Sequence, residues 1–247
     1  VIVKNNKVIG QGFHQQAGTP HAEVHALANL SVEQTSGATA YVTLEPCSHY
    51  GRTPPCAQAL IDAKLSCVVV AMQDPNPQVA GQGLAMLEQA GIQTIVGVLE
   101  NDARSLNPGF LKQMESKLPY VQLKLASSID GKTALGNGQS KWITGPAARA
   151  DVQAHRAMSC AILSSAFSVI TDDARLDVRE DELNVAYPQS DIINATRQPA
   201  KIILDGANRI TAELAPSLAL FKTPNSKVIL IKTPEDELTA KQAFESI

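Results

Sequence analysis

The chain has 247 residues, of which 44% are apolar and 18% charged, and its formal net charge is −3. This length fits one large domain or two ordinary ones, and the apolar fraction excludes an intrinsically disordered protein. The longest unbroken apolar stretch, residues 67–72, is too short to span a membrane, and no signal-peptide pattern is visible. The sequence has no Lys/Arg block, which argues against a nucleic-acid partner. We therefore expect a cytoplasmic protein with neither membrane nor nucleic-acid contacts.

The first half of the sequence predicts two antiparallel strands followed by alternating helices and strands. Residues 1–3 and 8–13 flank a polar turn and predict a hairpin. Thr19 and Pro20 predict the cap and the first position of a helix that runs to about residue 30. Further strands are expected at 38–44, 66–72 and 92–99, and helices at 55–64, just before residue 90, and at 100–117 with a break at Pro108. This order predicts a three-layer α/β domain over residues 1–117.

Leu118 and Pro119 mark the expected domain boundary, after which the strand and helix pattern begins again. A second α/β domain is predicted over residues 118–247, with a helix after Pro146 and strands at 120–126, 161–165, 201–204 and 227–232. The chain opens inside a predicted strand without an initiator Met, and residues 241–247 predict a helix without a stop signal. We therefore expect both ends to be cut and the second domain to be incomplete at its C-terminus.

The four cysteines fall into two groups. Cys67 and Cys160 lie in or beside apolar runs and are expected to be buried. Cys47 and Cys56 each follow a proline in the polar segment 45–56. Four unevenly spaced cysteines do not suit a disulfide scaffold of this length, so loop thiols of this kind indicate a metal ligand or a nucleophile.

A histidine and these two loop cysteines form a candidate metal site. His21, Cys47 and Cys56 are a sufficient three-ligand set for a catalytic zinc ion, which leaves a fourth position for water. Cys56 opens a predicted helix, whose dipole favours its thiolate. A fourth protein ligand, from His25 or His49, would instead indicate a structural zinc site.

Glu23 is the candidate proton carrier beside this metal site. It lies four residues after Thr19, one too far for a capping box, so helix capping does not account for it. Positions i and i+2 of a helix point to different sides, so His21 and Glu23 share a target only if the target lies off the helix N-terminus. A His-x-Glu followed by two Pro-Cys pairs resembles the zinc-deaminase signature.

The second half carries weaker signals. Its glycine pairs do not complete a G-x-G-x-x-G fingerprint, which argues against a Rossmann domain. Trp142 is the only tryptophan, and Ser140 and Thr144 lie beside it. Two arginines, Arg156 and Arg179, suit a phosphorylated sugar because guanidinium binds phosphate bidentately. The alternative interpretation of these charged residues is a solvated surface.

Four segments carry a specific family resemblance. They read His-Ala-Glu-Val-His-Ala-Leu at 21–27, Thr-Leu-Glu-Pro-Cys-Ser-His-Tyr-Gly-Arg-Thr-Pro-Pro-Cys at 43–56, Met-Gln-Asp-Pro-Asn-Pro-Gln-Val-Ala-Gly-Gln-Gly at 72–83, and Leu-Lys-Leu-Ala-Ser-Ser-Ile-Asp-Gly-Lys-Thr-Ala at 123–134. Eight residues separate the two loop cysteines, where many nucleoside and nucleic-acid deaminases have two. Over essentially its whole length the chain resembles the bifunctional riboflavin-biosynthesis deaminase/reductase family.

For the first domain, the resemblance implies a cytidine-deaminase-like fold that acts on 2,5-diamino-6-ribosylamino-4(3H)-pyrimidinone 5′-phosphate. Zinc would be held by His21, Cys47 and Cys56 and would activate water for attack on the carbon that carries the 2-amino group. Glu23 would shuttle protons while ammonia leaves. The family also has an Asn-containing pyrimidine-binding segment, which would lie before Val1.

For the second domain, the resemblance implies a dihydrofolate-reductase-like fold that uses NADPH to reduce the ribosyl group of 5-amino-6-(5-phosphoribosylamino)uracil to ribityl. The residues that match the family's NADP contacts are Ala126, Trp142, Ser168, Asp172 and Gly206. Those that match its substrate contacts are Ser140, Arg156, Leu176 and Arg179, and Lys124, charged amid an apolar strand pattern, is a further substrate-pocket candidate. A glycine-rich NADP segment would lie beyond Ile247, so we expect this chain to bind NADPH poorly.

The resemblance also implies a homo-oligomer with a small-molecule phosphoribosyl pyrimidine as substrate. Two alternatives stay open. One is a zinc deaminase of another base or nucleotide with a non-catalytic second domain. The other is a structural zinc site joined to a partner-binding module.

Overall fold

The computed structural model describes the chain except for residues 16–17, 52–53, 78, 187–196 and 234–247. It divides into two compact units, Val1–Leu123 and Lys124–Ile247. The division falls a few residues beyond the boundary expected at residue 118. No helix among the described residues is both long enough and apolar enough to cross a membrane.

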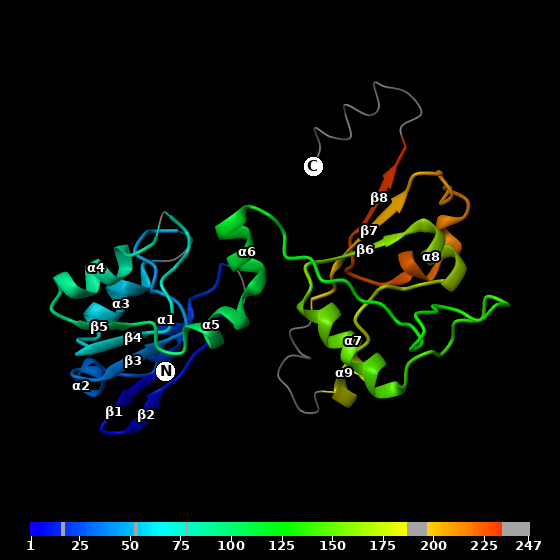
Figure 1. Ribbon diagram of the computed structural model, residues 1–247. Coiled ribbons are helices and arrows are strands. Elements are labelled where there is room, and N and C mark those ends of the chain that lie inside the picture. Colours follow the sequence, from blue (N-terminus) through cyan, green and yellow to red (C-terminus); the bar gives the residue numbers. More distant parts are fainter. Residues whose placement is uncertain (16–17, 52–53, 78, 187–196, 234–247) are drawn as a thin grey trace. The chain divides into compact units, whose positions relative to one another are not determined.

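A mixed five-stranded sheet forms the centre of the first unit, in the order β2-β1-β3-β4-β5 (Figure 1). β1 pairs antiparallel with β2 and β3, whereas β3, β4 and β5 run parallel. Asn5 and Asn6 both have positive φ, at 50° and 58°, as a two-residue hairpin turn requires. The predicted hairpin and the three later strands are therefore confirmed. The strands are β1 (Ile2–Lys4), β2 (Lys7–Gly10), β3 (Thr39–Val42), β4 (Cys67–Val70) and β5 (Gln93–Val96).

Among the described residues of this unit, six helices accompany the sheet: α1 (Ala22–Leu27), α2 (Val32–Thr35), α3 (Cys56–Asp62), α4 (Gln82–Gln89), α5 (Glu100–Leu106) and α6 (Pro108–Ser116). The predicted start of the first helix is wrong, because α1 begins at Ala22 and its N-cap is His21 rather than Thr19. Helix α2 was not predicted, although Ser31 and Gln34 form a capping box at its start. It is a single turn, too short for an apolar period to show.

Helices α1, α3 and α4 pack on one face of the sheet. Ala26, Leu60 and Leu87, one from each helix, join Val68 and Val70 of β4 in a single buried cluster. Full burial of each leucine contributes about 1.5–3 kcal/mol. This packing holds the N-termini of α1 and α3 on the same sheet, where two of the predicted metal ligands lie.

Glycine is required where the chain leaves β2 and passes α1. A Cβ at Gly12 would stand 2.4 Å from the carbonyl oxygen of Ala22, closer than any real contact allows. Only glycine therefore permits the backbone to approach the first turn of α1 this closely.

The second unit has a parallel three-stranded sheet in the order β6-β7-β8. Val169 of α8 packs with Ile203 of β7 and with Ile210 and Leu220 in a buried cluster. The strands predicted at 161–165, 201–204 and 227–232 are confirmed. The elements are α7 (Pro146–Met158), β6 (Ala161–Ser165), α8 (Ala166–Asp172), α9 (Glu180–Ala186), β7 (Ala200–Asp205), the 3₁₀ turns η2 (Ala215–Ser217) and η3 (Ala219–Lys222), and β8 (Val228–Lys232).

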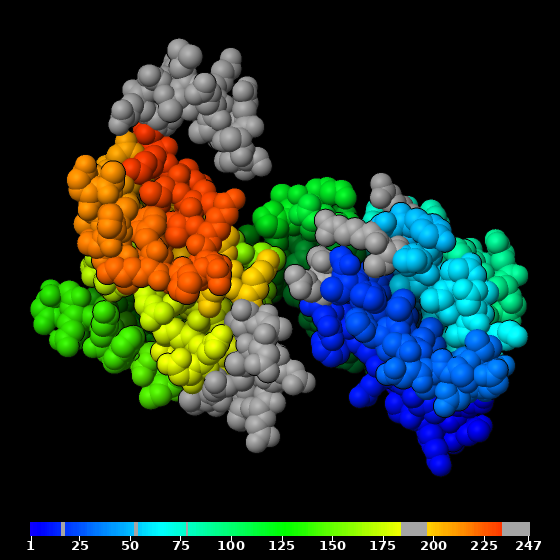
Figure 2. Space-filling model, turned by 180° about the vertical axis from the view of Figure 1, so that it is seen from behind, coloured from blue at the N-terminus to red at the C-terminus, as the bar shows by residue number. Residues whose placement is uncertain are grey.

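Two predictions for the second half are wrong. The strand expected at 120–126 does not form, since the described chain has no helix or strand between α6 and α7, and Val121 and Leu123 are 80% and 82% exposed. Figure 1 traces this stretch as an extended ribbon, and Figure 2 shows green atoms of this region at the surface. Alternating apolar and polar residues can give a strand one buried and one exposed face. A strand also needs a neighbouring strand with which its backbone N–H and C=O groups form hydrogen bonds. Cys160, expected to be buried, is exposed because it precedes the edge strand β6. The helix predicted at 241–247 lies outside the described residues.

Candidate functional site

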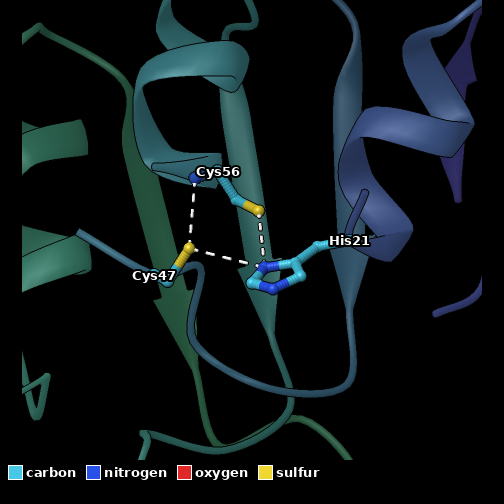
Figure 3. A group of neighbouring side chains, drawn as sticks. All are labelled: His21, Cys47 and Cys56. Atoms are coloured by element: carbon cyan, nitrogen blue, oxygen red, sulfur yellow. Dashed lines mark hydrogen bonds between the residues drawn. The ribbon is translucent and has the colours of Figure 1, made fainter. Parts of the chain in front are cut away.

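His21, Cys47 and Cys56 converge on one point in the first unit. The Nδ1 atom of His21 lies 3.2 Å from Sγ of Cys56 and 3.5 Å from Sγ of Cys47. All three ligand atoms lie within 4.8 Å of one another. Figure 3 shows the three side chains pointing toward each other from separate segments, with the contacts dashed. The structure thus brings together the three residues predicted as metal ligands.

Each of these side chains is placed by a secondary-structure boundary. His21 is the N-cap of α1, with extended backbone angles, and Cys56 is the first residue of α3 and is buried. Cys47 lies in the loop after β3. Its carbonyl accepts the N–H of Ala57 at 3.1 Å, and its Sγ accepts the N–H of Cys56 at 3.3 Å. Backbone bonds therefore fix the Cys47 loop against the start of α3.

The donor set and its spacing fit zinc. Bonds of about 2.0–2.1 Å to nitrogen and 2.3 Å to sulfur place two donors of a tetrahedral zinc ion about 3.6 Å apart, close to the distances found. Imidazole and thiolate are also the ligands zinc prefers. Within the described residues the cluster consists of these three groups, without His25 or His49. Such a set matches the open coordination of a catalytic site rather than the closed four-ligand set of a structural one.

The two thiols have opposite acid–base properties in the metal-free chain. Hydrogen bonding from the Cys56 thiol lowers the pKa of Cys47 to about 5. The pKa of Cys56 is raised, first because its proton is held by the Cys47 sulfur and then because burial disfavours its thiolate. The helix-dipole argument, which favoured a Cys56 thiolate, therefore misassigns the charge in the metal-free chain. A bound zinc ion deprotonates a coordinating thiol outright.

Glu23 lies beside the ligand cluster, in the first turn of α1. Its pKa is raised chiefly by burial, and the neighbouring Cys56, Cys47 and His21 also act on it. The arrangement is possible because His21 stands at the N-cap, outside the helical repeat, and can share a target with Glu23. Both residues thus lie at the N-terminal end of α1, where the sequence predicts their shared target.

Glu45 was not predicted as a site residue, although it directly precedes Pro46 and Cys47. Its side chain is buried, and its two carboxylate oxygens accept backbone N–H groups from the segment 74–84. The donors are Gly81 and Gly83, both at 2.9 Å, Asp74 at 3.2 Å and Leu84 at 3.3 Å. The signal available in the sequence was an acidic residue placed between an apolar strand and a Pro-Cys pair.

In the second unit, the two predicted substrate arginines lie around a buried aspartate. Arg156 donates to the carbonyl of Asp177 at 2.8 Å, and burial, followed by the charge of Arg179, lowers its pKa. Arg179 makes a bidentate pair with Glu182, at 2.7 and 2.9 Å, and lies 4.0 Å from Asp177. Leu176 immediately precedes Asp177 and has a positive φ of 52°. The sequence did not single out Asp177, which is the anion that these cations share.

Two of the predicted NADP residues lie at the carboxyl ends of neighbouring parallel strands. Ser168 follows β6 in the first turn of α8, where its N–H donates to Ser165 at 3.1 Å. Gly206 directly follows β7. Ligands of open α/β sheets bind at this edge. Asp172, the last residue of α8, is exposed.

The remaining predicted residues lie in the segment between α6 and α7. Lys124 is exposed, and Ala126 and Ser140 are partly exposed. Trp142 is 68% exposed, and the guanidinium of Arg149 lies 4.5 Å from its ring centroid. The apolar strand that suggested Lys124 does not form.

Comparison with protein families matches both halves of the chain. Residues 119–247 match the RibD C-terminal domain, and residues 1–72 match the cytidine and deoxycytidylate deaminase zinc-binding region. Riboflavin biosynthesis protein RibD of Escherichia coli K12 is 55% identical over 85% of this chain and 57% of the relative. That of Haemophilus influenzae is 53% identical over 99% of this chain and 64% of the relative.

Solved structures agree with these sequence relatives. Form 2 of Acinetobacter baumannii RibD has a TM-score of 0.83 and 46% identity, covering 97% of this chain and 63% of that one. A Thermotoga maritima diaminohydroxyphosphoribosylaminopyrimidine deaminase/5-amino-6-(5-phosphoribosylamino)uracil reductase has a TM-score of 0.80 and 34% identity, covering 96% and 63%. The chain thus spans about three-fifths of the length of these relatives. It belongs to the RibD family, with a cytidine-deaminase-like first unit and a dihydrofolate-reductase-like RibD C-terminal unit, as the sequence predicted.

Proposed function

We propose that the first unit is a zinc-dependent deaminase of 2,5-diamino-6-ribosylamino-4(3H)-pyrimidinone 5′-phosphate. The observation that carries this proposal is the convergence of His21, Cys47 and Cys56 with Glu23 beside them. The related Thermotoga maritima protein is named as a diaminohydroxyphosphoribosylaminopyrimidine deaminase, which supports this choice of substrate. Three protein ligands leave room for a reacting molecule at the fourth position of the metal.

Different residues of the chain bind the metal and transfer protons in this reaction. Zinc, when bound, supplies the activation of water at neutral pH. Glu23 accepts a proton from the water and delivers one to the departing amino group, and its raised pKa suits a group that must hold a proton part of the time. His21, Cys47 and Cys56 hold the metal and thereby fix where the water lies relative to Glu23. The reaction releases ammonia and leaves a ring carbonyl.

For the second unit, we propose NADPH-dependent reduction of the ribosyl group of the deaminated product. Ser168 and Gly206 lie at the carboxyl edge of the parallel sheet and are the proposed cofactor contacts, together with Ala126, Trp142 and Asp172. Arg156 and Arg179 are proposed to hold the phosphoribosyl substrate, with Ser140, Leu176 and Lys124. We also propose that the full enzyme is a homo-oligomer.

Substrate selection tests the deaminase proposal. Ammonia release is measured from the diaminopyrimidine ribotide, from cytidine and from guanine, with the zinc-loaded chain. Release from the ribotide alone is expected. Release only from cytidine or guanine would show a deaminase of another base. No release from any of the three, with zinc bound, would favour a structural zinc site.

A further inference from the structure

Glu45 connects the Cys47 loop to a segment far along the chain. Its side chain is 4% exposed, and its two oxygens accept four N–H groups from residues 74–84, at 2.9–3.3 Å. Its own backbone N–H donates to the carbonyl of Met72 at 3.0 Å. The carboxylate thus has more backbone partners than any ligand of the proposed zinc site.

Two of these contacts cap the N-terminus of a helix from outside that helix. The N-cap of α4 is Gly81, which has a φ of 78° and no side chain that could accept an N–H. Glu45 accepts the N–H groups of Gly83 and Leu84 in the first turn of α4 instead. A carboxylate at a helix N-terminus is also favoured by the helix dipole.

The same helix end contacts the residue next to Cys47. A Cβ at Gly83 would stand 2.0 Å from the carbonyl oxygen of Pro46, so the two backbones approach as closely as glycine allows. Cys47 is held on its other side by Ala57 and Cys56 of α3. The Pro46–Cys47 backbone is therefore fixed between α4 and α3.

We propose that Glu45 is a positioning residue of the zinc site: by clamping α4 to the Pro46–Cys47 backbone, it sets the distance of the Cys47 sulfur from His21 and Cys56 before metal binds. This inference rests on the zinc site proposed above. A glutamine at this position has one acceptor oxygen, and its NH₂ group faces backbone N–H groups. Glu45→Gln therefore breaks about half of the clamp while keeping its volume.

Thr35→Val is the matched control. Thr35 is buried, and its hydroxyl donates to the carbonyl of Ala63 at 2.7 Å. Ala63 caps the C-terminal end of α3, opposite Cys56. The control removes a buried hydrogen bond in the same unit, at the far end of the helix that begins with Cys56, without touching the Cys47 loop.

The test measures zinc affinity of the full chain by chelator competition, and the thiolate-to-metal absorption of the Co²⁺-loaded chain. Glu45→Gln is expected to weaken zinc binding by about 10–100-fold, the range found when partners of metal ligands are removed, and to change the Co²⁺ spectrum. Thr35→Val is expected to lower the melting temperature with both metal readouts unchanged. Glu45→Asp keeps two acceptor oxygens and should recover part of the affinity lost in Glu45→Gln.

The outcomes separate this inference from the proposed function. If the unmodified chain binds no zinc, the proposed deaminase site is wrong. If it binds zinc and Glu45→Gln binds equally tightly with the same Co²⁺ spectrum, the positioning role is overturned. If Glu45→Gln does not fold, Glu45→Asp decides: weaker zinc binding than the parent supports the role, and parental affinity overturns it.

Discussion

The Nδ1 atom of His21 and the Sγ atom of Cys56 lie 3.2 Å apart although the two residues are 35 positions apart in the sequence. His21 ends the approach to α1 and Cys56 begins α3, so the pairing depends on both helices packing on the same sheet face. The position of these two side chains relative to each other thus depends on the fold of the first unit. Substitutions at the site test its metal ligands and its proton carrier, and substitutions in the charge cluster of the second unit test the stability of that unit.

Replacing a ligand should remove the metal. Cys47→Ser exchanges a thiolate for a hydroxyl, a poor zinc ligand at neutral pH, so the zinc content of the purified chain should fall from about one ion per chain to a small fraction. Elemental analysis after dialysis measures this. Cys160→Ser makes the same chemical change at an exposed cysteine outside the cluster and should leave the zinc content at the parental level. Equal zinc content in both variants would exclude Cys47 as a ligand.

Breaking the charge cluster of the second unit should destabilise it. The side chain of Asp177 is 2% exposed and pairs with Arg175 at 2.6 Å. Arg156, Arg179 and the fully buried Lys201 lie nearby. Asp177→Asn leaves these cations without their shared anion. The substitution should lower the free energy of unfolding of the second unit by about 3–5 kcal/mol. Urea unfolding monitored by hydrogen exchange of the backbone amides in β6–β8 measures this change. Unchanged protection of these amides would contradict a stabilising role for Asp177.

The ion pair between Arg179 and Glu182 should make the second unit sensitive to acid. Hydrogen bonding from Arg179 lowers the pKa of Glu182. A carboxylate whose pKa is lower in the folded than in the unfolded state stabilises the fold above its unfolded pKa of about 4.3, and this contribution is lost as pH falls through the folded pKa. Glu182→Gln should therefore lower stability near neutral pH and flatten its decline on the acid side.

Protection of β6–β8 from hydrogen exchange across this pH range checks the prediction. Glu180→Gln is the control, because Glu180 is exposed on the same helix and has no ion pair within the part of the chain that the structure describes. Its pH profile should match that of the parent chain. A Glu182→Gln profile identical to that of the control would contradict the role of the pair.

Sequence patterns predicted those features that are local. The apolar run at β4 and the hairpin at Asn5 and Asn6 follow from neighbouring residues, and the ligand types needed for zinc are rare enough in combination to identify the cluster. The Glu45 clamp could not be predicted, because its four partners are backbone N–H groups 29–39 residues away that any sequence carries. The strand predicted at 120–126, which does not form, shows the same limit. An alternation of apolar and polar residues does not reveal whether a partner strand is present.

The Cys47 and Cys56 thiols give a further example. Helix position alone favoured ionisation of Cys56, but hydrogen bonding from Cys56, whose backbone N–H donates to the Cys47 sulfur, lowers the pKa of Cys47 instead. Which thiol ionises first in the metal-free chain therefore depends on a contact across the loop, and no local pattern contains it.

Ammonia release by Glu23→Gln tests the central claim most directly. Glutamine keeps the size of Glu23 but cannot carry the proton, so turnover of the diaminopyrimidine ribotide should fall by about 10²–10⁴-fold while zinc content stays at the parental level. Glu33→Gln, an exposed glutamate of α2, should turn over like the parent. Parental turnover by Glu23→Gln with zinc retained would contradict the proposed mechanism.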